Sequence, residues 1–108
     1  IAGGDVGYQD AIGTSARFSN PTALALAPDQ QFLYVSDSLN ARIRRIELAT
    51  NAVTTFAGNG NVIEVDGPAL DASTFPTGLA VGLNGAVYFT SGNARYVRRV
   101  YQGVVSRV

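Results

Sequence analysis

The hydrophobic positions of the chain fall in short runs that are separated by turn residues. Apolar residues, many of them β-branched or aromatic, occupy stretches of five to seven residues, with Gly, Pro, Asn or Asp between them. Such runs are typical of β-strands, and Asn84-Gly85 is typical of a hairpin turn. Pro21 and Pro76 each open an apolar run, as expected for a proline at the first position of a strand. The pattern predicts eight strands, over residues 22–27, 32–36, 42–47, 52–56, 77–81, 86–90, 95–101 and 104–108.

One segment has the spacing of a helix. Leu39, Ile43 and Ile46 follow one another at i, i+4 and i+7, which locally indicates an amphipathic helix. The corresponding segment of the second half, residues 95–101, is rich in strand-forming residues and has no room for three helical turns. We therefore expect a strand over residues 42–47 and little or no helix in the chain.

The chain contains two copies of one unit. Six blocks recur in the same order, 52 to 55 residues apart; for example, PTALAL at 21–26 is echoed by PTGLAV at 76–81. The drifting offset indicates a duplicated unit with small insertions and deletions. The first unit covers residues 1–56, with a connector over 1–20 and strands over 21–56. The second covers residues 57–108, with a connector over 57–75 and strands over 76–108.

Four short strands that recur every 50 residues or so are typical of the blades of a β-propeller. The stretch LYVSDSLNARIRRI, residues 33–46, resembles the NHL repeat, whose pattern runs Leu-Tyr-Val-(Ala/Ser)-Asp-Ser-x-Asn-x-Arg-Ile-Arg-Arg-Ile. The second copy departs from this pattern, because no Asp lies between Thr90 and Ser91 and because Tyr96 is an extra residue. The resemblance extends over essentially the whole chain.

The resemblance implies an all-β fold of two four-stranded antiparallel blades, part of a six-bladed β-propeller. One blade cannot bury both of its faces, so its neighbours must cover them. The chain supplies two blades, and other copies or flanking repeats of a larger chain would complete the ring. If other copies do so, six blades correspond to a homotrimer.

The resemblance also implies a role for the charged residues of the motif. An Asp that closes the second strand would accept a hydrogen bond from an Arg on the third strand and lock blade to blade, which is a structural role and not a ligand site. The residues expected in this blade lock are Asp37, Asn40, Arg42, Arg44, Asn93, Arg95 and Arg98. Because the second copy lacks the Asp, the lock is expected to be less complete there.

The composition excludes several kinds of chemistry. The chain has no His and no Cys, which rules out a Ser/His/Asp triad, a cysteine nucleophile and metal sites with imidazole or thiolate ligands. All eight cations are Arg, so Schiff-base chemistry and a phosphate-loop lysine are also excluded. We therefore expect no catalytic residue, no cofactor and no metal ion. Lyases that resemble this family depend on a His-held metal, which argues further against an enzyme.

Acidic residues and arginine pairs are the remaining candidates for a binding site. Glu64, Asp66 and Asp71 lack the alternating spacing of a calcium loop, so we expect no metal there. The arginine pairs 44–45 and 98–99 could bind phosphate, but eight acids balance the eight cations, which weighs against nucleic acid. We expect these arginines to form salt bridges at the blade edges with Glu47 and other acids. No apolar run approaches the ~20 residues of a membrane span, so no membrane insertion is expected.

Two functions fit these observations, and both make protein the partner. The first is a non-catalytic scaffold whose faces or edges bind other proteins. The alternative is a structural building block that assembles with itself into a ring, filament or fibre. An RNA-binding propeller and a lyase-type enzyme are less favoured, for the reasons of charge and composition given above.

Overall fold

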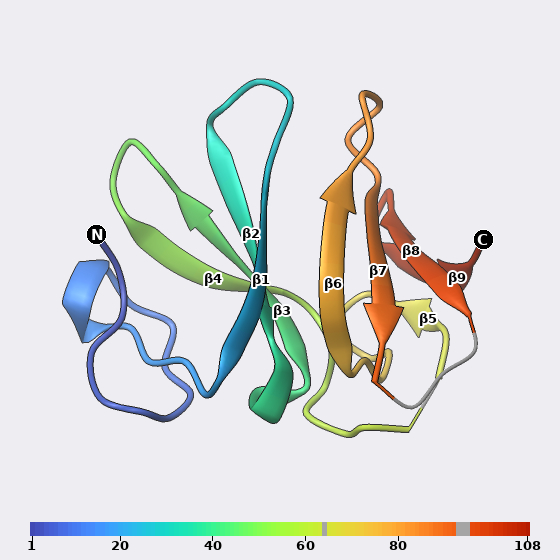
Figure 1. The fold of residues 1–108 in the computed structure, drawn as a ribbon, viewed down its shortest axis with the longest axis horizontal. Coiled ribbons are helices and arrows are strands. Elements are labelled where there is room, and N and C mark those ends of the chain that lie inside the picture. The colour runs from blue at the N-terminus through green and yellow to red at the C-terminus, as the bar shows by residue number, and fades with distance from the viewer. Residues whose placement is uncertain (64, 93–95) are drawn as a thin grey trace.

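A computed structural model describes residues 1–63, 65–92 and 96–108, which form two antiparallel β-sheets that lie side by side (Figure 1). The first sheet has the order β1-β2-β3-β4, with β1 (Pro21–Leu26), β2 (Phe32–Asp37), β3 (Arg42–Glu47) and β4 (Ala52–Ala57). The second sheet has the order β5-β9-β8-β7-β6, with β5 (Gly67–Pro68), β6 (Pro76–Val81), β7 (Val87–Ser91), β8 (Val97–Tyr101) and β9 (Val104–Arg107). The eight predicted strands are therefore confirmed to within two residues at each end.

The prediction of two four-stranded sheets is wrong for the second sheet, which has a fifth strand. Strand β5 comes from the connector and pairs antiparallel with β9, so that Gly67 lies opposite Val105. The first connector does nearly the same, because Ile12 forms a single bridge with Ala52 of β4. In both copies the connector runs back along the outer strand and satisfies backbone groups that an exposed edge would leave unpaired.

The segment with helical spacing forms a strand, as the comparison of the two copies predicts. Its helical part is the single 3-10 turn η2 (Ser38–Asn40) between β2 and β3; a second 3-10 turn, η1 (Gly13–Ser15), lies in the first connector. Ala41 follows η2 in the left-handed conformation, with φ of 52°, and turns the chain so that Asp37 of β2 pairs with Arg42 of β3. No helix within the described residues is long and apolar enough to cross a membrane.

The main hydrophobic core lies between the two sheets. Tyr34 and Ile43 of the first sheet pack there with Val87, Phe89 and Val100 of the second, and all five are less than 8% exposed. Strands β1 and β6, each at one edge of its own sheet, lie next to each other (Figure 1). Among the described residues, side-chain hydrogen bonds between the two halves run from Ser38 Oγ to Pro76 O (2.6 Å), from Thr74 Oγ1 to Ala41 O (3.0 Å) and from Thr22 Oγ1 to Thr77 O (3.2 Å).

A second, smaller core lies on the other side of the first sheet. Val35, Ile46 and Val53 are buried there together with Ala16 of the connector. Phe18 and other connector residues pack against this group and cover part of the sheet. The first connector therefore occupies the side of the first sheet that faces away from the second sheet.

Candidate functional site

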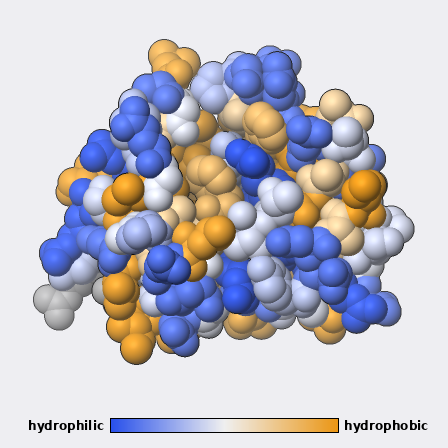
Figure 2. Space-filling model, turned by 180° about the vertical axis from the view of Figure 1, so that it is seen from behind, coloured by the Kyte–Doolittle hydropathy of each residue, from blue (hydrophilic) through white to orange (hydrophobic). Residues whose placement is uncertain are grey.

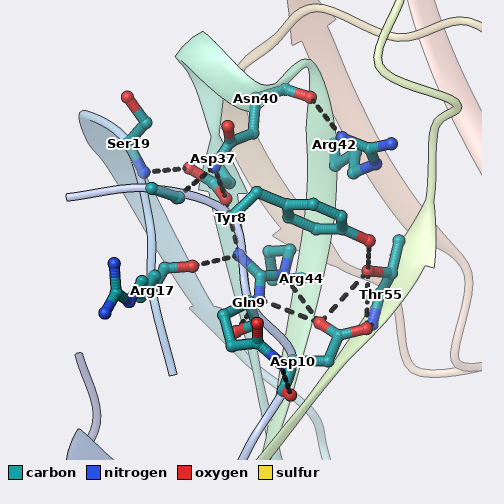
Figure 3. Close-up of polar contacts among 11 residues, drawn as sticks. Tyr8, Gln9, Asp10, Arg17, Ser19, Asp37, Asn40, Arg42, Arg44 and Thr55 are labelled. Atoms are coloured by element: carbon teal, nitrogen blue, oxygen red, sulfur yellow. Dashed lines mark hydrogen bonds and ion pairs between the residues drawn. The ribbon is translucent and has the colours of Figure 1, made fainter. Parts of the chain in front are cut away.

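Arg44 lies at the centre of a polar network between the first sheet and its connector (Figure 3). Its side chain is fully buried, and its Nη1 donates to Asp37 Oδ2 (2.7 Å) and Arg17 O (2.8 Å). Its Nη2 donates to Gln9 O (2.8 Å) and Asp10 Oδ1 (2.9 Å), and Nε also donates to Asp10 Oδ1 (3.2 Å). A guanidinium has five N–H groups, and all five of these have an acceptor within the protein. Arg44 has no donor left for a substrate or an anion.

Asp37 is the buried acceptor of this network. Its side chain is 0% exposed, and Oδ1 accepts a hydrogen bond from Ser19 N at 2.7 Å. Its Oδ2 accepts from Arg44 Nη1 (2.7 Å) and from Asn40 Nδ2 (2.8 Å). Asn40 Nδ2 also donates to Gly7 O at 2.7 Å. The expected contact between the Asp of strand two and an Arg of strand three is thus present, and it holds two points of the connector.

Arg42 lies at the edge of the same network. Its guanidinium stacks on the Tyr8 ring, with 3.9 Å from Cζ to the ring centre, and Nη1 donates to Asn40 O at 3.3 Å. The Tyr8 hydroxyl is hydrogen-bonded to the hydroxyl of Thr55 in β4. Arg42 therefore helps to fix the connector on the sheet through a cation–π contact.

The second copy repeats the arginine contacts almost atom for atom. Arg98 Nε and Nη2 donate to Asp66 Oδ1 (3.1 and 2.8 Å), Nη2 donates to Val65 O (3.0 Å) and Nη1 to Ser73 O (2.8 Å). These partners correspond to Asp10, Gln9 and Arg17 of the first copy. Ser91 stands where the first copy has Asp37. Two other residues of the predicted lock, Asn93 and Arg95, lie outside the described residues.

Each connector contributes one carboxylate to the network, Asp10 in the first copy and Asp66 in the second, and the motif does not reveal either of them. They precede their arginines by 34 and 32 residues. Alignment of the two copies offers the signal that finds them, because it places Asp66 opposite Asp10 and Arg98 opposite Arg44. The network joins each blade to the connector in front of it, while the contacts between the sheets are made by Thr22, Ser38, Thr74 and the apolar core. In the second copy that connector is the linker between the two blades.

The expected salt bridges of the arginine pairs at the blade edge are only partly present. Arg44 and Arg98 bind Asp residues, but Arg45 stacks on Phe32, with 4.6 Å from Cζ to the ring centre. Glu47 accepts a hydrogen bond from Thr50 instead of an arginine, so the expectation for Glu47 is wrong. Arg44 and Arg45 contact different partners because successive residues of β3 point to opposite faces of the sheet.

The acidic residues around Asp66 have no geometry for a metal ion in the part of the chain that is described. Asp66 is engaged by Arg98, and the described residues contain no group of three or more acidic side chains that could hold a metal. Glu64 lies outside the described residues.

The outer sides of both sheets are only partly covered. On the first sheet, a hollow of about 210 Å³ is lined by apolar residues, namely Ile1, Ala2, Phe18, Pro21, Leu24, Leu33, Val35 and Ile46. On the second sheet, a hollow of about 300 Å³ is lined by Gly78, Leu79, Ala80, Tyr88, Phe89, Thr90 and Val97, of which Tyr88, Thr90 and Val97 lie on the face that points away from the first sheet. Seen from behind, apolar side chains reach the surface of both blades among hydrophilic ones (Figure 2).

Comparison with known proteins places the chain among repeat proteins. No protein-family model matches it. NHL repeat-containing protein 2 from Bos taurus is 36% identical over 93 residues, which cover 84% of this chain and 12% of that protein. Protein SUPPRESSOR OF QUENCHING 1, chloroplastic, from Arabidopsis thaliana is 30% identical over 110 residues, covering 93% of this chain and 10% of that protein. The chain spans about a tenth of the length of these curated relatives.

Solved structures match the fold. A structural genomics protein of unknown function from Bacteroides thetaiotaomicron superposes with a TM-score of 0.81 at 20% identity, over 88% of this chain and 24% of that chain. An auxiliary nutrient binding protein from the same bacterium gives a TM-score of 0.75 at 23% identity, over 95% of this chain and 26% of that chain. The two sheets thus match a portion of larger β-propeller-like structures. Together with the identity to NHL repeat-containing proteins, this confirms the resemblance seen in the motif: the chain is an NHL-repeat propeller module.

Proposed function

We propose that this module is a non-catalytic scaffold that binds protein through the open faces of its blades. The observation that carries the proposal is that the buried charged residues of the motif bind to other parts of the module itself. The buried arginine of the motif spends all five N–H groups on the protein itself, and its buried carboxylate partner accepts three hydrogen bonds. Arg44 and Asp37, which carry charges that could bind a small molecule, are used to hold the connector.

The surfaces that remain open have the composition of protein-binding surfaces. Leu24 and Leu26 of the edge strand β1 are 62% and 48% exposed. Exposed apolar residues gathered around a hollow are typical of sites that another protein covers. In a larger propeller the protein that covers these faces would be a further blade, with six blades in a closed ring.

The experiment is site-specific photo-crosslinking in the cells that produce the protein. A photoreactive amino acid is placed at Leu24, on the open face, and in a matched control at Leu83, which is 96% exposed at the tip of the β6–β7 hairpin. We expect position 24 to cross-link to protein in high yield and position 83 to do so weakly. Equal or lower yield at position 24 would show that the face is not a protein-binding surface.

The alternative function, a building block that assembles with itself, is favoured by one specific observation. The contact between the two sheets joins two different faces, and one face of each kind is left open at the outside of the molecule. Self-assembly therefore requires no surface other than those that already meet inside the chain.

A further inference from the structure

The contact between the two sheets has two sides of different kinds. The second sheet contributes the face with Leu79, Val87, Phe89 and Val100, which we call a leading face. The first sheet contributes the opposite kind of face, which carries Tyr34 and Ile43 and which we call a trailing face. Tyr34 is 7% exposed and Ile43 0%, so the leading face of the second sheet buries both side chains.

The outer side of the first sheet is also a leading face. Alignment of the two copies places Leu24, Leu33, Val35 and Ile46 at the positions of Leu79, Val87, Phe89 and Val100. These four residues line the hollow of about 210 Å³ together with connector residues such as Phe18. Leu24 is 62% exposed, whereas Val35 and Ile46 are already buried by the connector, so the open part of this face lies around Leu24. At the corresponding place on the second sheet, Tyr34 and Ile43 from the first sheet fill the space.

The outer side of the second sheet is a trailing face. Tyr88 and Val97 stand at the positions of Tyr34 and Ile43, and both line the hollow on this side. Tyr88 pairs with Arg99 as Tyr34 pairs with Arg45, which places each tyrosine on the same side of its sheet as that arginine. The open faces thus correspond, residue for residue, to the two faces that pack together inside the molecule.

We propose that the leading face of one copy binds the trailing face of a second copy, with Tyr88 seated in the hollow beside Leu24. This inference rests on the proposed function and names its partner, a second copy of this chain arranged head to tail. A second copy fits better than an unrelated protein because the residue that would fill the hollow is again a tyrosine, on the same kind of surface. Head-to-tail contacts of this type generate a ring when the rotation closes and a filament when it does not.

The polar contacts between copies are weaker than those inside the molecule. The hydrogen bond from Thr22 to the Thr77 carbonyl has a counterpart between copies, because Thr77 of one copy meets the Thr22 position of the next. The other two hydrogen bonds have no counterpart between copies, because Gly92 stands at the position of Ser38 and Phe18 stands at the position of Thr74. Association is therefore expected to depend on protein concentration and to dissociate on dilution while each chain stays folded.

The test uses two variants that each damage one face. Leu24→Arg places a charge on the leading face and Tyr88→Arg places one on the trailing face, and Leu83→Arg at the hairpin tip is the control. Light scattering gives the mass of each protein from low to high micromolar concentration, and far-UV circular dichroism checks that each variant keeps its β-structure. If an arginine variant unfolds, Leu24→Ser or Tyr88→Ser replaces it.

We expect the wild-type chain and Leu83→Arg to form particles of three or more chains, and each face variant alone to stay at one chain mass. An equal mixture of the two face variants is expected to form dimers, because each supplies the face that the other lacks. A wild-type chain that stays monomeric would overturn the inference, and so would association of either face variant with itself. A monomeric wild-type chain that still cross-links to protein through Leu24 in cells would overturn this inference alone and leave the scaffold function standing.

Discussion

Replacement of Asp37 by Asn removes the charge of the buried carboxylate while the size of the side chain is unchanged. Asp37 is fully buried, and its two oxygens accept hydrogen bonds from Ser19, Asn40 and Arg44 at 2.7 to 2.8 Å. An asparagine oxygen in the place of Oδ2 can still accept from Asn40 and Arg44. Its NH₂ group then faces the N–H of Ser19, and two donors meet without an acceptor.

The expected loss is about 3 kcal/mol of unfolding free energy. Hydrogen bonds to a charged group contribute about 1.5–3 kcal/mol each, and removal of one partner from a buried ion pair costs about 3–5 kcal/mol. We expect the low end of the range for a broken buried ion pair because Arg44 keeps its contacts with Asp10. In a domain of this size the loss corresponds to a melting temperature roughly 12–24 °C lower.

The matched control is Asp66→Asn, which changes the acidic partner of the other buried arginine. The side chain of Asp66 is 43% exposed, so water can replace part of what the carboxylate provides to Arg98. We expect a loss of about 1 kcal/mol, near the upper end for ion pairs accessible to solvent.

Urea unfolding at one fixed protein concentration measures both losses, with far-UV circular dichroism or tyrosine fluorescence as the signal, since the chain has no Trp. The reasoning would be refuted if Asp37→Asn lost no more stability than Asp66→Asn. That result would mean that burial does not set the strength of the network, and that Asp37 is not its principal acceptor.

Two further substitutions test the packing of the blades. In Gly58→Ala, the new Cβ would lie 2.5 Å from Ala41 O, and the residue has a φ of +102°, so we expect the free energy of unfolding to fall by at least about 2 kcal/mol. The control is Gly85→Ala, where the new Cβ has no neighbour within 4 Å and the free energy of unfolding should fall by about 1 kcal/mol. Similar losses in urea unfolding would contradict the close approach at Gly58. Phe89→Ala leaves a cavity between the sheets, where Phe89 is 1% exposed, and is expected to lower the free energy of unfolding by about 3–5 kcal/mol. The control is Leu83→Ala at a 96% exposed position, which should change the free energy of unfolding by no more than about 0.5 kcal/mol. A small loss for Phe89→Ala, measured by thermal unfolding, would show that the sheets do not share a packed core.

The strands, their turns and the duplication were determined by the sequence alone, because each depends on residues that are close together in the chain. Strands need short apolar runs, and hairpins need residues that tolerate positive φ, such as Gln102 and Gly103 with φ of 51° and 76°. The helical spacing around Ile43 was misleading as a local signal, and the second copy corrected it. The repeat thus supplied information that a single copy does not contain.

The partners of the buried arginines were decided only by the tertiary structure. Arg44 and Arg45 are neighbours in the sequence, yet one binds two carboxylates and the other stacks on Phe32, because successive residues of a strand point to opposite faces. Asp10 reaches Arg44 only because the connector folds back along β4 and brings together residues that are 34 positions apart. The motif predicts that its charged residues are structural, and the path of the connector decides which contacts they make, since contacts over such separations depend on how the whole blade closes.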